Sequence, residues 1–115
     1  MKTWDAIHRF FGTEKWRREE ADRWARQTFS DYDYRSAAAV LDILVLELGV
    51  SFEQLRPGTR LAADLAADED EPFMITLHLK ETLSISVSTE QVVESRTVGG
   101  LVELVSRTLH ETSAS

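Results

Sequence analysis

Four consecutive acidic residues, Asp68–Glu71, are the densest group of side chains in the sequence that could do chemistry. Carboxylates in a run suggest calcium binding, because Ca²⁺ takes oxygen ligands from such side chains. A calcium-binding loop that starts at Asp64 requires glycine where Glu69 stands and a bidentate glutamate where Ile75 stands. A loop that starts at Asp68 fails at the corresponding places. The sequence therefore excludes this calcium motif, and we expect no metal site.

The other residue types that serve catalysis lack the necessary arrangement. No cysteine is present, which removes disulfides, thiolate nucleophiles and cysteine-based zinc sites. The histidines, His8, His78 and His110, are far apart and lack the spacing of metal ligands. Gly99-Gly100 lacks the rest of a phosphate-binding fingerprint, and we expect it to permit close helix packing or a flexible helix start. Paired catalytic carboxylates need a cleft that separates their pKa values, so we expect no enzymatic activity and no catalytic residue.

The composition is that of one acidic globular domain. The chain has 115 residues, 43% of them apolar, with 13 Lys and Arg against 20 Asp and Glu and a formal net charge of −7. A chain of this length can bury a core without disulfides. The acidity argues against nucleic acid as a partner, because Lys and Arg drive phosphate binding. No apolar run approaches the roughly 20 residues that span a bilayer, and the first residues do not resemble a signal peptide. We therefore expect a cytoplasmic protein with no membrane span.

Charge and aromatic residues divide the chain at about residue 30. Residues 1–30 carry seven basic and five acidic side chains, a net charge of +2, whereas residues 31–115 carry six and fifteen, a net charge of −9. All three tryptophans, Trp4, Trp16 and Trp24, lie in the first part. We therefore expect a helical N-terminal extension, residues 1–30, joined to a helical body, residues 31–115.

The extension is predicted to form two short helices. Thr3 is expected to cap a helix that ends at Gly12, and Thr13 to cap a second helix that runs to about Phe29. Oppositely charged side chains recur at helical spacing: Glu14 with Arg18, Glu19 with Arg23, and Asp22 with Arg26. We expect the tryptophans to pack on the body; the alternative is that the extension docks on a partner protein or a membrane.

The body begins with a predicted helix and a long connection. Ser30 with Asp33 resembles a capping box, and Gly49 supplies a left-handed stop at the end of the helix. Residues 51–70 follow, with a turn signal at residues 56–59. Single apolar residues recur along this connection, so we expect it to lie packed over a helical core. These residues are Phe52, Leu55, Leu61 and Leu65.

A central helix is predicted from Glu71 to Leu83, with Asp70 as its N-cap. Phe73 and Leu77 form one apolar row of this helix. Because a second apolar row runs beside it, we expect the helix to be buried on more than one side. The second row is Ile75, Leu79 and Leu83.

Two more helices complete the predicted body. An extended connection leads to a short helical turn that begins at Ser88. Thr97 is expected to cap the last helix, and residues from Glu111 to Ser115 are expected to form a frayed tail. The inward residues of the last helix are Val98, Leu101, Val102, Val105 and Leu109. The pattern predicts an all-α fold.

From about Ala37 to Leu109, the sequence resembles the acyl carrier protein family. The resemblance depends on the order of the helices and on residues spread along the chain. Those residues are Leu48-Gly49-Val50, Leu55, Pro57, Thr59, Leu61, Asp64-Leu65-Ala66-Ala67-Asp68, Leu83, Ile85, Val87 and Thr97-Val98. The resemblance implies an acyl-carrier-like four-helix bundle, with the N-terminal extension as an additional helical element. Ala66 stands where the family usually has glycine.

The resemblance also implies where a prosthetic group would be attached. In the family, an Asp-Ser-Leu triplet opens the central helix, and its serine carries 4'-phosphopantetheine. The corresponding residues here are Asp68, Glu69 and Asp70, with Glu69 at the serine position. A carboxylate cannot form the serine phosphodiester and repels the phosphate, so we expect no cofactor and no cofactor-binding residue. The alternative is a carrier protein modified at another hydroxyl, of which Thr76 and Ser84 are the nearest.

The resemblance further implies an acidic central helix that binds basic patches on partner enzymes. Met74, Lys80 and Glu81 stand where the family usually has glutamate, so only one negative charge remains at those positions. The candidate partner-binding residues are Asp68, Glu69, Asp70, Glu71, Met74 and Glu81. We therefore expect a non-enzymatic protein-interaction module, with enzymes of acyl or polyketide-type metabolism as the implied partners. A second alternative is a lipid-binding bundle whose pocket is lined by Phe73, Leu77 and Val102.

Overall fold

Apolar residues that recur every three to four positions lie on one face of a helix, and the chain folds into such helices. The computed structural model describes the backbone of residues 2–114 and the side chains of residues 14–111. The helices are α1 (Lys2–Thr28), α2 (Tyr34–Leu48), the 3-10 helix η1 (Phe52–Gln54), α3 (Leu61–Leu65), α4 (Glu71–Leu83), α5 (Thr89–Ser95) and α6 (Val98–Ala114). Within this described backbone no strand forms, and Arg60 makes one isolated antiparallel bridge with Thr97. The predicted all-α class is confirmed.

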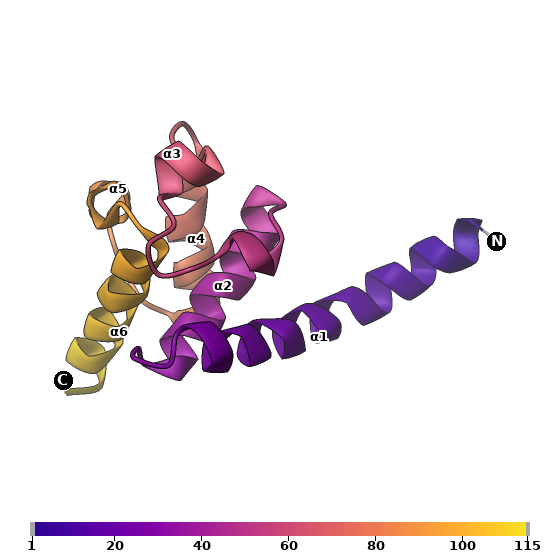
Figure 1. Cartoon of the computed structure of the whole chain (residues 1–115), viewed down its shortest axis with the longest axis horizontal. Helices are drawn as coiled ribbons and strands as arrows, with labels where there is room; N and C mark the ends of the chain where they lie inside the picture. Colours follow the sequence, from indigo (N-terminus) through magenta and orange to yellow (C-terminus); the bar gives the residue numbers. More distant parts are fainter. Residues whose placement is uncertain (1, 115) are drawn as a thin grey trace.

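One continuous helix, Lys2–Thr28, takes up most of the N-terminal extension, so the prediction of two short helices is wrong. A glycine inside a helix costs about 1 kcal/mol relative to alanine. A break at Gly12 would instead leave up to four unpaired N–H groups and four unpaired carbonyl groups at the new helix ends. Continuing the helix is therefore the better solution. Figure 1 shows α1 running along α2 with its C-terminal half, while its N-terminal half points away from the other helices.

The C-terminal half of α1 is fixed to the body by burial and by two polar contacts. Ala21 and Ala25 of α1 are buried, as is Phe29 directly after the helix. Trp24 donates a hydrogen bond from Nε1 to the carbonyl oxygen of Leu55 at 2.6 Å. A half-buried ion pair joins α1 to α2, with 2.6 Å between Arg17 Nε and Asp42 Oδ1. α1 thus contributes directly to the hydrophobic core of the body.

The tryptophans follow the packing prediction only in part. Trp24 packs against the core, but the side chain of Trp16 is 59% exposed. The side chain of Trp4 lies outside the described residues. Only one of the two described tryptophans therefore packs on the body.

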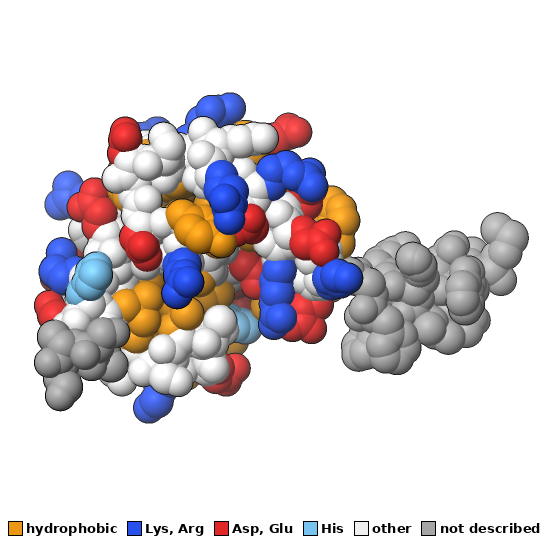
Figure 2. Space-filling model, turned by 90° about the horizontal axis from the view of Figure 1, so that it is seen from below, with side chains coloured by type: hydrophobic (Ala, Val, Ile, Leu, Met, Phe, Trp, Pro, Cys, Tyr) orange, Lys and Arg blue, Asp and Glu red, His pale blue; other side chains and the backbone are white. Residues whose placement is uncertain are grey.

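Two of the three predicted charge pairs along α1 are confirmed. Glu14 pairs with Arg18, and Asp22 pairs with Arg26. The predicted Glu19–Arg23 pair is wrong, because Arg23 pairs with Glu20, which lies three residues before it. On the face seen in Figure 2, acidic and basic side chains are interspersed, with apolar side chains between them. The division of charge along the sequence therefore does not produce a separate basic area and acidic area on this face of the molecule.

α2 lies at the centre of the bundle and packs against α1, α4 and α6 (Figure 1). Most of its apolar face is buried, with Val45 and Leu48 only half-buried, and the facing residues of α4 and α6 are buried too. The fully buried residues of these three helices include Val40, Leu41, Leu44, Ile75, Leu79, Val98, Leu101, Val102 and Val105. The predicted anchors of the long connection also pack as expected: Leu55, Leu61 and Leu65 are buried, and Phe52 is half-buried against the core.

The caps explain where the body helices begin and end. The N-cap of α2 is Asp33 and not the predicted Ser30: the Asp33 carboxylate accepts hydrogen bonds from the backbone N–H of Ser36 at 3.0 Å and from its hydroxyl at 2.7 Å. α2 stops at Gly49, whose φ of 68° is the predicted left-handed conformation. The predicted bounds of α4 are confirmed. Asp70 precedes α4 as expected, but its helical φ and ψ differ from the extended cap geometry, and its side chain makes no cap hydrogen bond.

The last two helices begin where the sequence predicts. Ser88 forms a capping box with Gln91 at the start of α5. Thr97 accepts a hydrogen bond at Oγ1 from the N–H of Gly100 at 3.0 Å. The predicted frayed tail from Glu111 is wrong as far as Ala114, since the backbone of α6 continues to that residue, and Ser115 lies outside the described residues. No glycine or proline stands in this stretch to stop the helix.

Gly99 and Gly100 permit the close packing that the sequence suggests. A Cβ on Gly99 would lie 2.6 Å from Tyr32 Oη, and a Cβ on Gly100 would collide with the carbonyl oxygen of Ser95. Both sites therefore exclude larger residues at the start of α6.

We predict that Gly100→Ala lowers the free energy of unfolding by about 1–3 kcal/mol, because the new methyl group forces the Ser95 carbonyl to shift. Gly58→Ala is the matched control, since nothing lies within 4 Å of a Cβ there. Urea denaturation followed by circular dichroism measures both variants. Equal midpoints for the two alanine variants would contradict the packing described here.

A second prediction concerns acid. The hydrogen bonds from the Ser36 side chain and backbone hold the pKa of Asp33 below its ordinary value. Asp33 therefore stabilises the fold above about pH 4, the range in which the unfolded carboxyl is ionised, and this contribution disappears as the pH falls through the folded pKa. Asp33→Ala should cost about 1 kcal/mol at pH 7.

The Asp33 contribution is measured as the difference in unfolding free energy between wild type and Asp33→Ala across pH 2–7. We expect this difference to shrink below about pH 4, since only the wild type has a carboxylate to protonate at the cap. The difference between Asp33→Asn and Asp33→Ala should stay constant, because an asparagine cap does not titrate. A constant wild-type difference would rule out the ionised cap.

Candidate partner-binding site

The acidic run lies at the start of α4, in water. Asp68, Glu69 and Asp70 are exposed in the turn that precedes the helix, and Glu71 is the half-buried first residue of α4. The Glu71 carboxylate accepts a hydrogen bond at Oε1 from the N–H of Glu69 at 3.1 Å. Negative charge is favourable at this end of a helix, because the unpaired N–H groups there carry partial positive charge. The run is thus a solvated helix start whose side chains are open to a partner.

The predicted row of Phe73 and Leu77 lies on the exposed side of α4, so the expected burial of this helix on more than one side does not extend to this row. Pro72, Ile75 and Leu79 occupy the buried face. Phe73 is 52% exposed and Leu77 is 38% exposed. Successive residues are turned by 100° around a helix, so a narrow buried face leaves these two side chains outside it. Together these two side chains, one turn apart, place apolar area on the surface beside the acidic turn.

The remaining predicted partner-binding residues lie along the same helix. Met74 is half-buried, and Glu81 is exposed, as is Lys80. The structure therefore places the six predicted residues on one turn and one helix, with the acidic residues concentrated at the N-terminal end.

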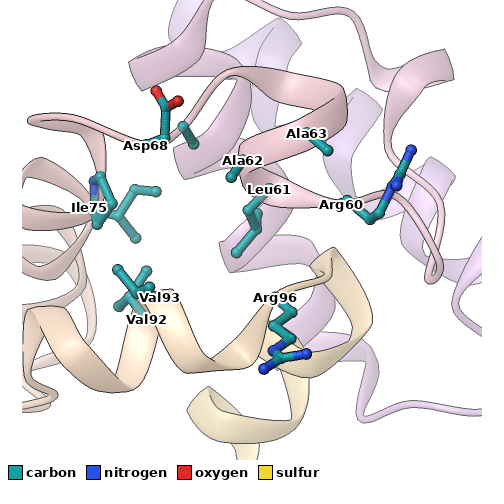
Figure 3. A pocket seen from close by; sticks show the side chains of 11 residues that line it. Arg60, Leu61, Ala62, Ala63, Asp68, Ile75, Val92, Val93 and Arg96 are labelled. Atoms are coloured by element: carbon teal, nitrogen blue, oxygen red, sulfur yellow. The ribbon is translucent and has the colours of Figure 1, made fainter.

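A cavity of about 260 Å³ opens beside the acidic turn, between α3, α4 and α5 (Figure 3). Most of its lining is apolar. The lining residues are Arg60, Leu61, Ala62, Ala63, Ala67, Asp68, Pro72, Ile75, Val92, Val93 and Arg96. This cavity is not the lipid pocket predicted from the sequence, since Phe73 and Leu77 are exposed and Val102 lies in the core.

Charged side chains stand at two ends of the cavity. Figure 3 shows the guanidinium groups of Arg60 and Arg96 at one end and the carboxylate of Asp68 at the other, all turned away from the cavity. Arg60 is already paired: its Nη2 lies 2.9 Å from Asp64 Oδ1, and these hydrogen bonds hold the pKa of Asp64 below its ordinary value. Arg96, by contrast, forms no ion pair with any of the side chains that the structure describes, residues 14–111.

The backbone at Arg96 is strained. Its φ of 62° and ψ of −44° lie outside the regions that residues other than glycine commonly adopt. The N–H of Thr97 donates to the carbonyl oxygen of Ser95 at 2.6 Å, which closes a γ-turn around Arg96. The Arg96 carbonyl accepts a hydrogen bond from the N–H of Leu61 at 2.8 Å, which fixes the turn against α3. The arginine is thus held at the rim of the cavity.

Sequence reasoning missed this end of the site. Arg60 and Arg96 stand 36 positions apart and belong to no motif, so only the packing of the connection on the α5–α6 link brings them together. A turn with positive φ usually contains glycine, and this sequence has arginine there instead.

The alternative attachment hydroxyls and the described histidines lie outside the acidic turn. Thr76 is buried and donates to the carbonyl oxygen of Phe73 at 2.5 Å, whereas Ser84 is exposed at the far end of α4. His78 Nε2 lies 2.8 Å from Glu47 Oε2 and links α4 to α2. His110 is exposed on α6, and the side chain of His8 lies outside the described residues.

Across the described side chains, no three His, Asp or Glu residues come close enough to hold a metal ion. Likewise, none of the helices in the described part of the chain has the length and apolar character needed to cross a membrane. No protein-family model matches the chain, and no solved structure matches it.

We predict that Arg96→Gly unfolds with a free energy about 1 kcal/mol larger than that of Arg96→Ala, because glycine relieves the backbone strain at positive φ. Both variants lack the guanidinium, so the comparison isolates the backbone. The same pair of substitutions at Arg107, which is exposed within α6, should give the opposite order by about 1 kcal/mol. Urea denaturation tests both pairs, and the same order at the two positions would contradict the strained turn.

Proposed function

We propose that this chain is a non-enzymatic, acyl-carrier-like protein-interaction module that carries no phosphopantetheine. The observation that carries the proposal is the position of Glu69: an exposed carboxylate in the turn that opens α4, where the family has the serine that bears the prosthetic group. The order of long helix, packed connection, central helix, short helix and last helix supports the same four-helix frame.

Ala66 gives independent support for this alignment. It stands where the family usually has glycine, and it adopts a left-handed conformation with φ of 58° and ψ of 31°. Glycine is the residue that favours this conformation, because an added Cβ makes it strained. The turn between α3 and α4 therefore requires a left-handed backbone at this position, which the family's glycine would adopt without strain.

The side chains of the turn explain why no prosthetic group is expected. A serine hydroxyl attacks phosphorus as an alcohol and forms a phosphodiester, whereas the Glu69 carboxylate would give an unstable mixed anhydride. Asp68 and Asp70 add negative charge on both sides of Glu69, and all three side chains are exposed. Their charge repels an approaching phosphate.

The exposed face of α4 supports binding of a protein partner. Phe73 and Leu77 offer apolar area, with the half-buried Met74 beside them, and the acidic turn provides charge at one end. A partner that combines apolar and basic side chains would complement this surface. The family resemblance implies enzymes of acyl or polyketide-type metabolism as the partner class.

The proposal is tested by restoring the attachment site. Wild type and the double variant Glu69→Ser/Asp70→Leu are incubated with coenzyme A and a broad-specificity phosphopantetheinyl transferase, and intact masses are measured. We expect no mass gain for wild type and the gain of one phosphopantetheinyl group for the double variant. Glu69→Gln/Asp70→Leu is the matched control, which removes the same charges but adds no hydroxyl.

Each other outcome has a definite meaning. A gain on wild type at residues 68–70 would refute the absence of the cofactor. A gain on wild type mapped to Ser84 would favour a carrier protein modified elsewhere. If the double variant remains folded but unmodified, the acyl-carrier frame itself is contradicted.

A further inference from the structure

The cavity beside α4 separates apolar and charged groups in a way that constrains what it can receive. Figure 3 shows the side chains of Leu61, Ile75 and Val92 converging on the cavity, while the charged ends of its rim residues point away from it. A charged group placed inside would lose its hydration without gaining a partner. The cavity therefore fits an uncharged apolar group, and ionic contacts are available only at its rim.

The volume limits the size of that group. At about 260 Å³, the cavity is smaller than the roughly 300–1,000 Å³ typical of small-molecule pockets. A single large apolar side chain is the kind of anchor that fills such a recess at a protein interface. Val93, 57% exposed at the rim, extends the apolar surface beyond the opening.

The rim is electrically asymmetric, which gives an occupant a direction. Arg60 is committed to Asp64, so the guanidinium of Arg96 is the cation left for an incoming group at that end. Asp68 marks the opposite end. A chain that crosses the opening is thus complementary when its acidic residue lies toward the α5–α6 link.

We propose that this cavity receives one bulky apolar side chain of a partner peptide segment, whose neighbouring Asp or Glu pairs with Arg96. This inference deepens the proposed interaction function and rests on it. The strained γ-turn supports a role for the Arg96 side chain, since a glycine would meet the backbone geometry at lower cost. The hydrogen bond between the Leu61 N–H and the Arg96 carbonyl holds the Arg96 backbone beside Leu61, so this side chain starts at the rim of the cavity.

The probe is a phage-displayed library of random 12-residue peptides, selected on the immobilised full-length chain. We expect enriched peptides to share a large apolar residue with Asp or Glu within four positions. Their dissociation constants are then measured as synthetic peptides. Filling the opening with Ala62→Trp should weaken binding roughly 30-fold, the size of effect seen when an anchor is lost. Arg96→Gln should weaken it roughly two- to fivefold, as expected for an exposed ion pair.

Matched controls separate loss of the site from loss of folding. Thr82→Trp adds the same ring at an exposed position of α4 outside the cavity and should leave affinity unchanged. Val93→Glu is a second variant that changes the rim of the cavity and should also weaken binding. Because Val93 is exposed, this replacement leaves the hydrophobic core intact, so a loss of binding is not a loss of folding. In each peptide, replacing the acidic residue by its amide should remove the effect of Arg96→Gln.

Three results would overturn the inference: no peptide that depends on the cavity, binding that survives Ala62→Trp, or binding that ignores the peptide's acidic residue. This test is independent of the transferase test. Peptides that bind at the cavity support an interaction site even if Glu69→Ser/Asp70→Leu is not modified. Modification of that variant without cavity-dependent peptides would leave the proposed function supported and the anchor site rejected.

Discussion

The pairing of the connection with the α5–α6 link is the constraint on which the site depends. The N–H of Leu61 donates to the carbonyl of Arg96 at 2.8 Å, and the N–H of Val98 donates to the carbonyl of Thr59 at 2.9 Å. A long connection loses much conformational entropy when it is ordered, and these bonds, together with its buried leucines, compensate for that loss. They place α3 over α5, so one wall of the cavity and the turn that carries Glu69 are positioned together. The site is thus a consequence of tertiary pairing and not of any single helix.

α2 supplies the second constraint, because it is the helix that α1, α4 and α6 share. α4 packs against α2 and α5, and Phe73 and Leu77 lie on its remaining side, which faces water. The same central position explains how the extension joins the body. Ala21 and Ala25 let α1 approach α2 closely, and the Arg17–Asp42 pair closes the contact. The charge division at residue 30 therefore does not coincide with a division of the hydrophobic core.

The features that the sequence predicted are those decided by neighbouring residues. Gly49 ends α2, and Thr97 begins α6, because caps depend on a few adjacent residues. Gly12 does not end α1, because stopping there would leave the backbone groups of two new helix ends unpaired. Phe73 is exposed although the sequence predicts its burial. Apolar periodicity identifies two rows on this helix but does not indicate which row faces the core. The position of Arg96 had no local signal at all, since it depends on a contact with Leu61, which is 35 residues away in the chain.

Within the proposed frame, the turn before α4 combines two features with different consequences. Its backbone makes a left-handed turn at Ala66, which directs the following residues to the start of the helix. The side chain presented there, Glu69, is exposed and anionic, so it can attract a basic partner but cannot hold a phosphodiester. Beside it, the apolar face of α4 and the cavity provide area that a purely electrostatic contact lacks. Charge mainly sets orientation and association rate, while buried apolar anchors set the dissociation rate, so under the proposed function we expect the acidic turn to guide a partner and the apolar area to hold it.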